Sequence, residues 1–269
     1  MDKLTVNYHT HTVRCQHAEG TDREYVEKAV ERGMKLLGFS DHVSMPFPDG
    51  HESRFRVPRA QLDNYVQSVL ALREEFKDRI RILLGFEAEY YPDLFEAMRE
   101  LLRPYPVDYL ILGQHFNDSR ELIYHTRPQW DPEALHTYVD RVLEAAASGA
   151  FTYVAHPDLP NYCGEEKAYT QEMTRLCEGL KEQDIPLELN LLGLREKRNY
   201  PDPRFWEIAA KTGNRVILGC DAHRPEDVAD PENVAEAFAW TRRFGLVPEE
   251  TIAVKNPFTG KKERLIHDL

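Results

Sequence analysis

Residues 7–17 read Asn-Tyr-His-Thr-His-Thr-Val-Arg-Cys-Gln-His, and this stretch decides how the rest of the chain is interpreted. Apolar and polar residues alternate just before it, which predicts a short strand that runs into His9. Side chains at positions i and i+2 share one face of a strand, so His9 and His11 should point to the same place. With His17 in the following loop, this stretch offers three imidazole ligands to a transition metal.

Short apolar runs alternate with amphipathic helical stretches along the whole chain, and no repeat or linker divides it, so residues 1–269 are expected to form one domain. The predicted strands span residues 4–8, 35–40, 80–86, 109–113, 151–155, 186–190 and 215–220. The predicted helices span about residues 22–33, 59–77, 94–102, 132–148, 169–182, 204–211 and 231–243. A polar tail is expected after the last helix.

Seven strands that are each followed by a helix predict a parallel α/β barrel, in which right-handed crossovers bring the carboxyl ends of all strands to one face. Continuous apolar runs such as residues 82–86 are typical of a sheet that is buried on both sides. An open doubly wound sheet is the alternative. The barrel is preferred because only a closed barrel arranges all strand ends around one centre.

Side chains that bind metals recur at or just after the ends of these predicted strands. Seven of the eleven histidines lie there: His9, His11, His17, His42, His115, His156 and His223. Glu87 and Asp221 occupy equivalent places. The other four histidines, which we expect at the surface, are His51, His125, His136 and His267. The recurrence predicts one metal centre at the carboxyl ends of the strands.

Composition limits the class of protein. The chain is 42% hydrophobic, enough for a sizeable core, but it has neither a long apolar run nor a charged-then-apolar leader, so no membrane span or signal peptide is expected. Four cysteines without C-x-x-C spacing favour reduced thiols in a cytoplasm. A formal net charge of −12 argues against a nucleic-acid partner, and an anionic substrate would have to be attracted locally.

In combination these motifs resemble the polymerase and histidinol phosphatase (PHP) family, and most closely its stand-alone histidinol-phosphate phosphatases. The segments that carry the resemblance are His9-Thr-His11, Cys15-Gln-His17-Ala-Glu-Gly, Ser40-Asp-His42, Gly85-Phe-Glu87, Gln114-His115, His156-Pro-Asp-Leu, Gly193-Leu-Arg195 and Asp221-Ala-His223-Arg-Pro-Glu. The resemblance implies a distorted (β/α)7 TIM-like barrel and hydrolysis of L-histidinol phosphate to L-histidinol and phosphate. The sequence departs from the family pattern at Cys220 and at Leu191-Leu192, where small polar residues would be expected.

The same resemblance implies that nine side chains hold two to three divalent ions, among zinc, iron and manganese. The implied sets are His9, His11, Glu87 and Asp221 for the first ion, Glu87, His115 and His156 for the second, and His17, His42 and His223 for the third. Glu87 would bridge the first two ions, which leaves a hydroxide between them to attack phosphorus.

Three carboxylates are candidates for catalytic residues: Glu87, Asp221 and Asp41. For Asp41, orientation of His42 or its neighbours is favoured over proton donation. Glu89 is expected to support an imidazole N–H rather than to bind metal. With three divalent ions and only two ligand carboxylates, the site would carry a formal charge of about +4, which selects an anion such as a phosphomonoester.

Two arginines are candidates for binding the substrate. Arg195 follows the sixth strand, so it should reach over the barrel mouth, and a guanidinium can bind a phosphate through two donors. Arg54 lies in the long loop after the second strand, and Arg56 in the same loop is a further candidate for a lid.

Other functions remain open at this point. The chain could act on a different small phosphomonoester, or it could be an amidohydrolase-like deacylase, which is disfavoured because strand four ends in His115 without a bridging lysine. A non-catalytic or nucleic-acid-processing module is disfavoured by the complete ligand set and the acidic chain. The sequence leaves the oligomeric state unknown.

Overall fold

The computed structural model describes residues 3–121 and 124–263, and its strands form one parallel sheet in which strand order follows chain order. The seven strands are β1 (Val6–Asn7), β2 (Leu36–Phe39), β3 (Arg81–Ala88), β4 (Tyr109–Leu112), β5 (Phe151–Val154), β6 (Leu187–Asn190) and β7 (Val216–Gly219). A doubly wound sheet would reverse its strand order at a switch point, and this sheet does not. The predicted distorted (β/α)7 barrel is confirmed.

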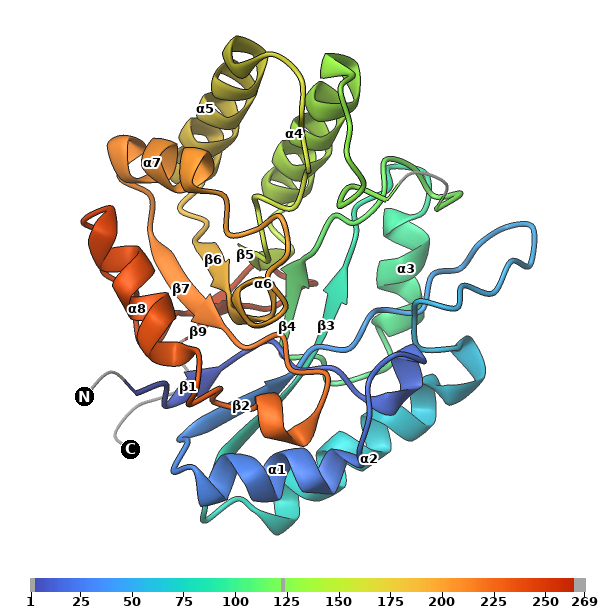
Figure 1. Cartoon of the computed structure of the whole chain (residues 1–269). Helices are drawn as coiled ribbons and strands as arrows, with labels where there is room; N and C mark the ends of the chain where they lie inside the picture. The colour runs from blue at the N-terminus through green and yellow to red at the C-terminus, as the bar shows by residue number, and fades with distance from the viewer. Residues whose placement is uncertain (1–2, 122–123, 264–269) are drawn as a thin grey trace.

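Helices surround the strands on the outside of this ring, except α6 (Leu191–Arg195), which lies over the mouth of the barrel directly after β6 (Figure 1). They are α1 (Asp22–Glu31), α2 (Leu62–Glu75), α3 (Phe95–Leu102), α4 (Pro132–Ala147), α5 (Glu166–Glu182), α6 (Leu191–Arg195), α7 (Pro203–Thr212) and α8 (Val234–Arg243), with short 3-10 turns at η1 (Val13–Cys15), η2 (Arg59–Gln61) and η3 (Pro225–Asp227). Helix α1 begins with a capping box between Thr21 and Glu24, which satisfies backbone N–H groups that the helix itself cannot pair.

The ring closes only at one end. No ladder between β1 and β7 is formed by the described residues, but the chain segments just after them are joined. The His11 N–H donates to the Ala222 carbonyl over 2.9 Å, and the Ala222 N–H donates to the His9 carbonyl over 3.3 Å. Closure therefore occurs beyond the carboxyl ends of the two strands, where the predicted ligands lie.

Two apolar clusters hold the barrel together, one between the strands and the helices and one inside the ring. Tyr109 crosses the interior, and its hydroxyl donates to the Tyr8 carbonyl over 2.6 Å. Gly85 leaves room for the Tyr109 ring, because a Cβ built at that glycine would lie 2.4 Å from a ring carbon. The interior is thus packed, and the site can form only at its rim.

The segment after α8 differs from the polar tail that the sequence predicts. It forms an antiparallel hairpin of β8 (Val254–Lys255) and β9 (Lys262–Glu263). Ile252 and Val254 pack into the interior cluster from the amino-terminal ends of the strands. Two apolar residues in a polar context were too weak a signal for a strand.

The histidines away from the strand ends are placed as follows. His51 is exposed and His136 is half-exposed, but His125 is 1% exposed, so its predicted surface position is wrong. His125 packs edge-on against Tyr138, which covers its ring. His267 lies outside the described residues. None of the helices in the described part of the chain is both long and apolar enough to span a membrane.

Candidate metal centre

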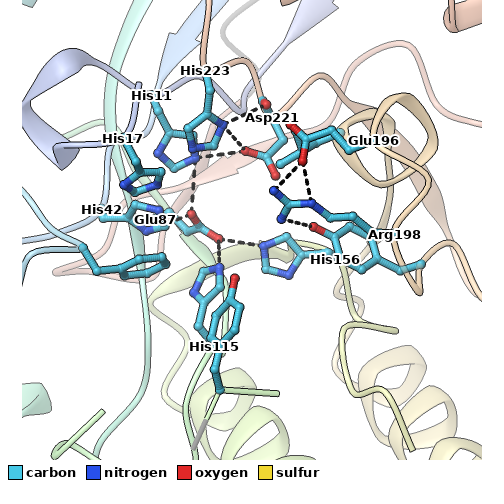
Figure 2. Close-up of a pocket in the computed structure, with 14 residues that line it drawn as sticks. His11, His17, His42, Glu87, His115, His156, Glu196, Arg198, Asp221 and His223 are labelled. Carbon is cyan, nitrogen blue, oxygen red and sulfur yellow. Dashed lines mark hydrogen bonds and ion pairs between the residues drawn. The ribbon is translucent and has the colours of Figure 1, made fainter. Parts of the chain in front are cut away.

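The nine predicted ligands converge at the end of the barrel where the ring closes, and most of them line one pocket of about 250 Å³ (Figure 2). They come from seven different segments: the loops after β1, β2, β4, β5 and β7, the turn after η1, and strand β3 itself. His9 lies deeper than the others and is fully buried. The structure therefore brings together every residue that the sequence places in the metal site.

Glu87 lies at the centre of the cluster. Its Oε2 atom lies 3.4 Å from His11 Nε2 and 3.5 Å from His9 Nε2. Its Oε1 atom lies 2.9 Å from His156 Nε2 and 3.6 Å from His115 Nε2. One oxygen thus faces each group of imidazoles, which is the arrangement that a bridging carboxylate requires.

Ligand atoms also gather into small groups of the size that one ion needs. His17, His42 and His223 form one group whose ligand atoms all lie within 4.8 Å of one another, and it matches the implied third set. Two further groups form around His9, one with His11 and Asp221 and one with Glu87 and His156. The two groups around His9 combine imidazole nitrogen with carboxylate oxygen, whereas the third set offers nitrogen alone, and zinc, iron and manganese accept both kinds of ligand.

Buried polar atoms at the centre lack hydrogen-bond partners, and this is the observation that tests the fit of metal ions. Five buried atoms of the ligand side chains make no hydrogen bond among the described residues, and all of them except His156 Nδ1 have only ion-pair contacts of 3.1–3.5 Å: His11 Nδ1, His42 Nδ1, Glu87 Oε2, His156 Nδ1 and Asp221 Oδ1. Such groups are costly to bury unless something binds them. The residues present therefore fit a multinuclear metal centre.

The pKa values of the cluster also indicate a site that attracts positive charge. Burial by itself would lower the pKa of His9, but the charges of Asp221, Glu188 and Glu87 outweigh burial and raise it to about 10. Burial would raise the pKa of Glu87, yet the surrounding imidazoles hold it well below its usual range. The carboxylates remain ionised and attract positive charge, which protons or metal ions can provide.

A layer of carboxylates behind the ligands fixes the imidazole rings. Glu188 Oε1 lies 2.8 Å from His9 Nδ1, and Glu89 Oε1 lies 3.0 Å from His115 Nδ1. Each contact occupies Nδ1 and leaves Nε2 of the same ring for the centre. Glu89 thus has the supporting place that the sequence predicts, whereas no role is predicted for Glu188.

Asp41 belongs to this supporting layer and does not line the pocket. It is fully buried, it accepts hydrogen bonds from Thr12 and from the His42 N–H, and it lies 3.5 Å from His11 Nδ1. This position suits the orientation of His11 and His42. It therefore favours the orienting role predicted for Asp41 over proton donation, and a catalytic role of Asp41 stays a prediction.

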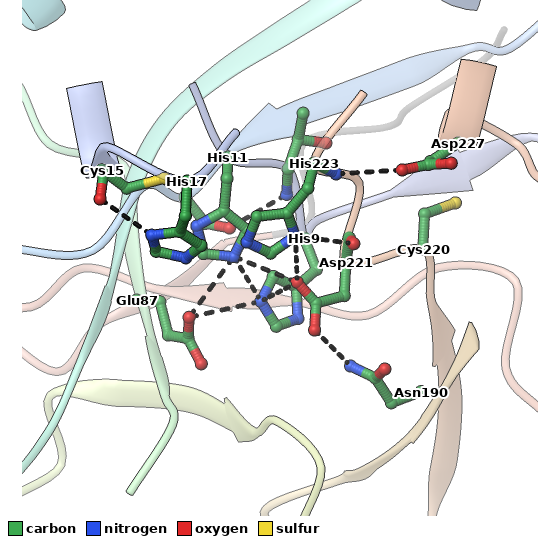
Figure 3. Close-up of polar contacts among 12 residues, drawn as sticks. His9, His11, Cys15, His17, Glu87, Asn190, Cys220, Asp221, His223 and Asp227 are labelled. Atoms are coloured by element: carbon green, nitrogen blue, oxygen red, sulfur yellow. Dashed lines mark hydrogen bonds and ion pairs between the residues drawn. The ribbon is translucent and has the colours of Figure 1, made fainter. Parts of the chain in front are cut away.

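Two glycines make room for the central carboxylates. A Cβ built on Gly113 would lie 1.7 Å from Glu87 Oε1, and one built on Gly219 would lie 1.7 Å from Glu188 Oε1. Asn190 then links the deeper carboxylate to the centre, because its Nδ2 donates to Glu188 over 2.9 Å and to Asp221 over 3.1 Å. Figure 3 shows the contact with Asp221.

The supporting layer changes the charge of the site. The value of about +4 counts only two carboxylates, but Glu188, Asp41 and Glu89 lie directly behind ligands, and Arg56 is paired with Glu89. Arg56 also pairs with Glu121, so with three divalent ions and these additional charges the formal charge becomes about +1. The site still attracts a phosphate dianion, although less strongly than the ligand count alone suggests.

The structure turns Arg195 away from the pocket. Its Nη1 lies 2.7 Å from Asp230 Oδ2 and its Nε 3.4 Å from Asp227 Oδ1, and it is absent from the pocket lining. Helix α6, which is only five residues long and was not expected, sets this direction. Arg54 is exposed and does not line the pocket either.

A different arginine, Arg198, lines the pocket opposite the histidines (Figure 2). Its Nη2 lies 2.7 Å from Glu196 Oε2, and its Nη1 donates to the Tyr200 hydroxyl over 3.1 Å. Phe55 and Tyr124 line the pocket on the side of the histidines, with ring centroids 4.1 Å from His42 and 6.0 Å from His115, respectively. No sequence pattern points to these residues, because they lie in irregular loops, whose path hydrophobic periodicity does not predict.

Comparison with known proteins agrees with this architecture. A model of the PHP domain matches residues 7–191. A probable histidinol-phosphatase from Deinococcus radiodurans is 31% identical over 230 residues, which are 82% of this chain and 86% of the relative. A probable histidinol-phosphatase from Schizosaccharomyces pombe is 23% identical over 87% of this chain and 86% of the relative.

Solved structures share the fold. A histidinol phosphate phosphatase from Lactococcus lactis, solved with zinc, L-histidinol and phosphate, has a TM-score of 0.71 at 20% identity and covers 98% of this chain and 99% of its own. At that identity the likeness concerns the fold alone. Together with the matching family model and the 31% identical relative, the converging ligands show that the chain belongs to the PHP domain family.

Proposed function

We propose that this protein is a metal-dependent phosphomonoesterase that hydrolyses L-histidinol phosphate to L-histidinol and phosphate. The observation that carries the proposal is the cluster around Glu87, in which seven imidazoles and two carboxylates meet at one pocket. Two relatives named as probable histidinol-phosphatases support this substrate.

The nine ligands would hold two to three ions of zinc, iron or manganese, which would supply an activated water and neutralise charge at phosphorus. The chain itself supplies the rest of the site. Glu87 and Asp221 hold negative charge at the centre, while Glu188, Glu89 and Asp41 keep three imidazole rings in place. Their role is to present a rigid, positively charged site to the phosphate.

The opposite wall suits a substrate that carries charges of both signs. Arg198 offers guanidinium donors to phosphate oxygens, and the neighbouring Glu196 offers a carboxylate to an ammonium group. Beside the ligand histidines, Phe55 and Tyr124 provide flat surfaces for an imidazole ring. Histidinol phosphate carries a phosphate, an amine and an imidazole, so it matches all three features.

We expect direct hydrolysis without a covalent phosphocysteine intermediate, because the pocket lining offers no thiol nucleophile in the part of the chain that the structure describes. No cysteine is among the pocket residues of the described chain, and Cys15 and Cys220 are fully buried. Burial raises the pKa of both thiols, which makes them poor nucleophiles. The free cysteines, together with the acidic charge of the chain, favour a cytoplasmic enzyme acting on a small molecule rather than on nucleic acid.

Turnover of competing substrates tests the proposal. Protein stripped of metal and reloaded separately with zinc, iron or manganese should hydrolyse histidinol phosphate with a kcat/KM well above that for an aryl phosphate. It should leave a cyclic amide and single-stranded DNA intact. A preference for another phosphomonoester would support the proposed phosphatase activity but refute histidinol phosphate as the substrate. Hydrolysis of the amide alone would refute the phosphatase activity itself.

A further inference from the structure

A roof loop, residues 43–59 between β2 and α2, reaches over the metal centre. Its Phe55 ring packs against three ligand histidines, with ring centroids 4.1 Å from His42, 4.9 Å from His115 and 5.2 Å from His17. The base of the loop is tied to the same place, because the Val57 N–H donates to the His42 carbonyl over 3.0 Å. The position of this loop therefore decides how the ligands are covered.

The next residue, Arg56, points inward and is only 2% exposed. Its Nη1 donates to Glu89 Oε2, and its Nε donates to Glu121 Oε1 over 2.8 Å. The other oxygen of Glu89 holds His115 Nδ1 over 3.0 Å. An unbroken series of charged contacts thus runs from the roof loop to a metal ligand.

The geometry of these contacts requires an arginine. A guanidinium is planar and presents its donors in fixed directions, so it can bind two carboxylates that lie on different segments, whereas a lysine ammonium acts as a single point charge. Glu89 directly follows the last residue of β3, and Glu121 lies in the loop after β4. Removal of the guanidinium would leave Glu89, which is fully buried, without its cation.

We propose that Arg56 is a positioning residue that couples closure of the roof loop to the orientation of the ligand His115 through Glu89. Docking of Arg56 places the neighbouring Phe55 over the histidines and at the same time fixes the carboxylate that holds His115. The covered site and the correctly oriented ligand form together. The inference deepens the proposed function, and it rests on the presence of metal ions rather than on the identity of the substrate.

Metal retention tests this coupling. For Arg56→Met we expect a ten- to hundred-fold loss of affinity for one ion, measured by the zinc that folded protein keeps at graded chelator concentrations, together with a lower kcat for histidinol phosphate. Arg56→Lys should recover part of the affinity. As a matched control, Arg23→Met removes the exposed Arg23–Glu75 pair between α1 and α2 and should retain zinc as the wild type does.

A double mutant separates coupling from general support of the fold. Because Arg56 acts through Glu89, adding Arg56→Met to Glu89→Gln should lower zinc affinity little further, while urea unfolding reports the stability of each variant separately. If Arg56→Met does not fold, the affinity of Arg56→Lys carries the test. Wild-type zinc retention by the folded variant would overturn the proposal. Failure of wild-type protein to hydrolyse histidinol phosphate, with zinc loss in Arg56→Met, would instead refute only the substrate.

Discussion

At the scale of single residues, the two oxygens of Glu87 face two different groups of imidazoles, so this side chain is expected to control two ions at once. Glu87→Ala should disrupt binding of both of these ions and reduce turnover below detection. His17→Ala should remove only the third ion, because His17 groups with His42 and His223 and not with Glu87. Elemental analysis of each folded variant checks the prediction. A single ion or none in carefully prepared wild-type protein would contradict it.

The two arginines that follow β6 should behave differently. Arg198→Ala is expected to lose about 1.5–3 kcal/mol of transition-state binding, roughly ten- to a hundred-fold in kcat/KM, because a charge-assisted contact to phosphate is removed. Arg195→Ala should keep kcat/KM near the wild-type value. It should instead lower the free energy of unfolding by about 3 kcal/mol, since buried Asp230 loses its arginine partner, whereas Asp227 keeps Arg224.

Steady-state kinetics and urea unfolding on the same two variants check this division. The metal content should remain that of the wild type in both, because neither side chain is a ligand. A loss of kcat/KM in Arg195→Ala that exceeds the loss in Arg198→Ala would show that α6 moves in solution and that the family motif predicts the phosphate contact after all.

At the scale of the elements, the close approach of neighbouring strands leaves space for the carboxylates only at glycine. Gly219→Ala would place a Cβ against Glu188 and push it from His9, so we expect a destabilisation of about 1–3 kcal/mol and weaker metal binding. Shortening the carboxylate with Glu188→Asp in the same chain should recover part of the stability. Thermal unfolding and the zinc content of each variant test the prediction. Wild-type stability and zinc content in Gly219→Ala would contradict the close packing of Gly219 against Glu188.

The elements also show how far sequence reasoning reaches. All seven strands of the barrel are predictable: most from short apolar runs, which a sheet buried on both faces leaves, and β1 and β6 from alternating apolar residues. Ligands at strand ends are predictable for the same reason, since a parallel barrel fixes where those ends meet. Helix α6 and the β8–β9 hairpin are too short to show periodicity. They decide the direction of Arg195 and the closure of the barrel interior, which is why those features needed the structure.

At the scale of the whole molecule, the seam between β1 and β7 is joined just where the ligands lie. His9 and His11 follow the first strand and Asp221 follows the last, and the three form one candidate group. Removal of metal by a chelator should therefore lower the melting temperature by roughly 5–10 °C, the effect of about 3 kcal/mol of binding on a chain of this size. Amide hydrogen exchange should accelerate most in β1 and β7 and least in β3 and β4. Uniform acceleration across the sheet would contradict a role of the metal at the seam.

The same seam has a consequence for the unfolded chain. His9 and Asp221 are about 210 residues apart in the sequence, so an ion held by both closes a very long loop. Such a cross-link removes many extended conformations from the unfolded ensemble, in the way that a disulfide between distant cysteines does. Unlike a disulfide, it forms and breaks with the supply of free metal. The concentration of zinc, iron or manganese around the protein would then set how much of the chain is folded, as well as how much of it is active.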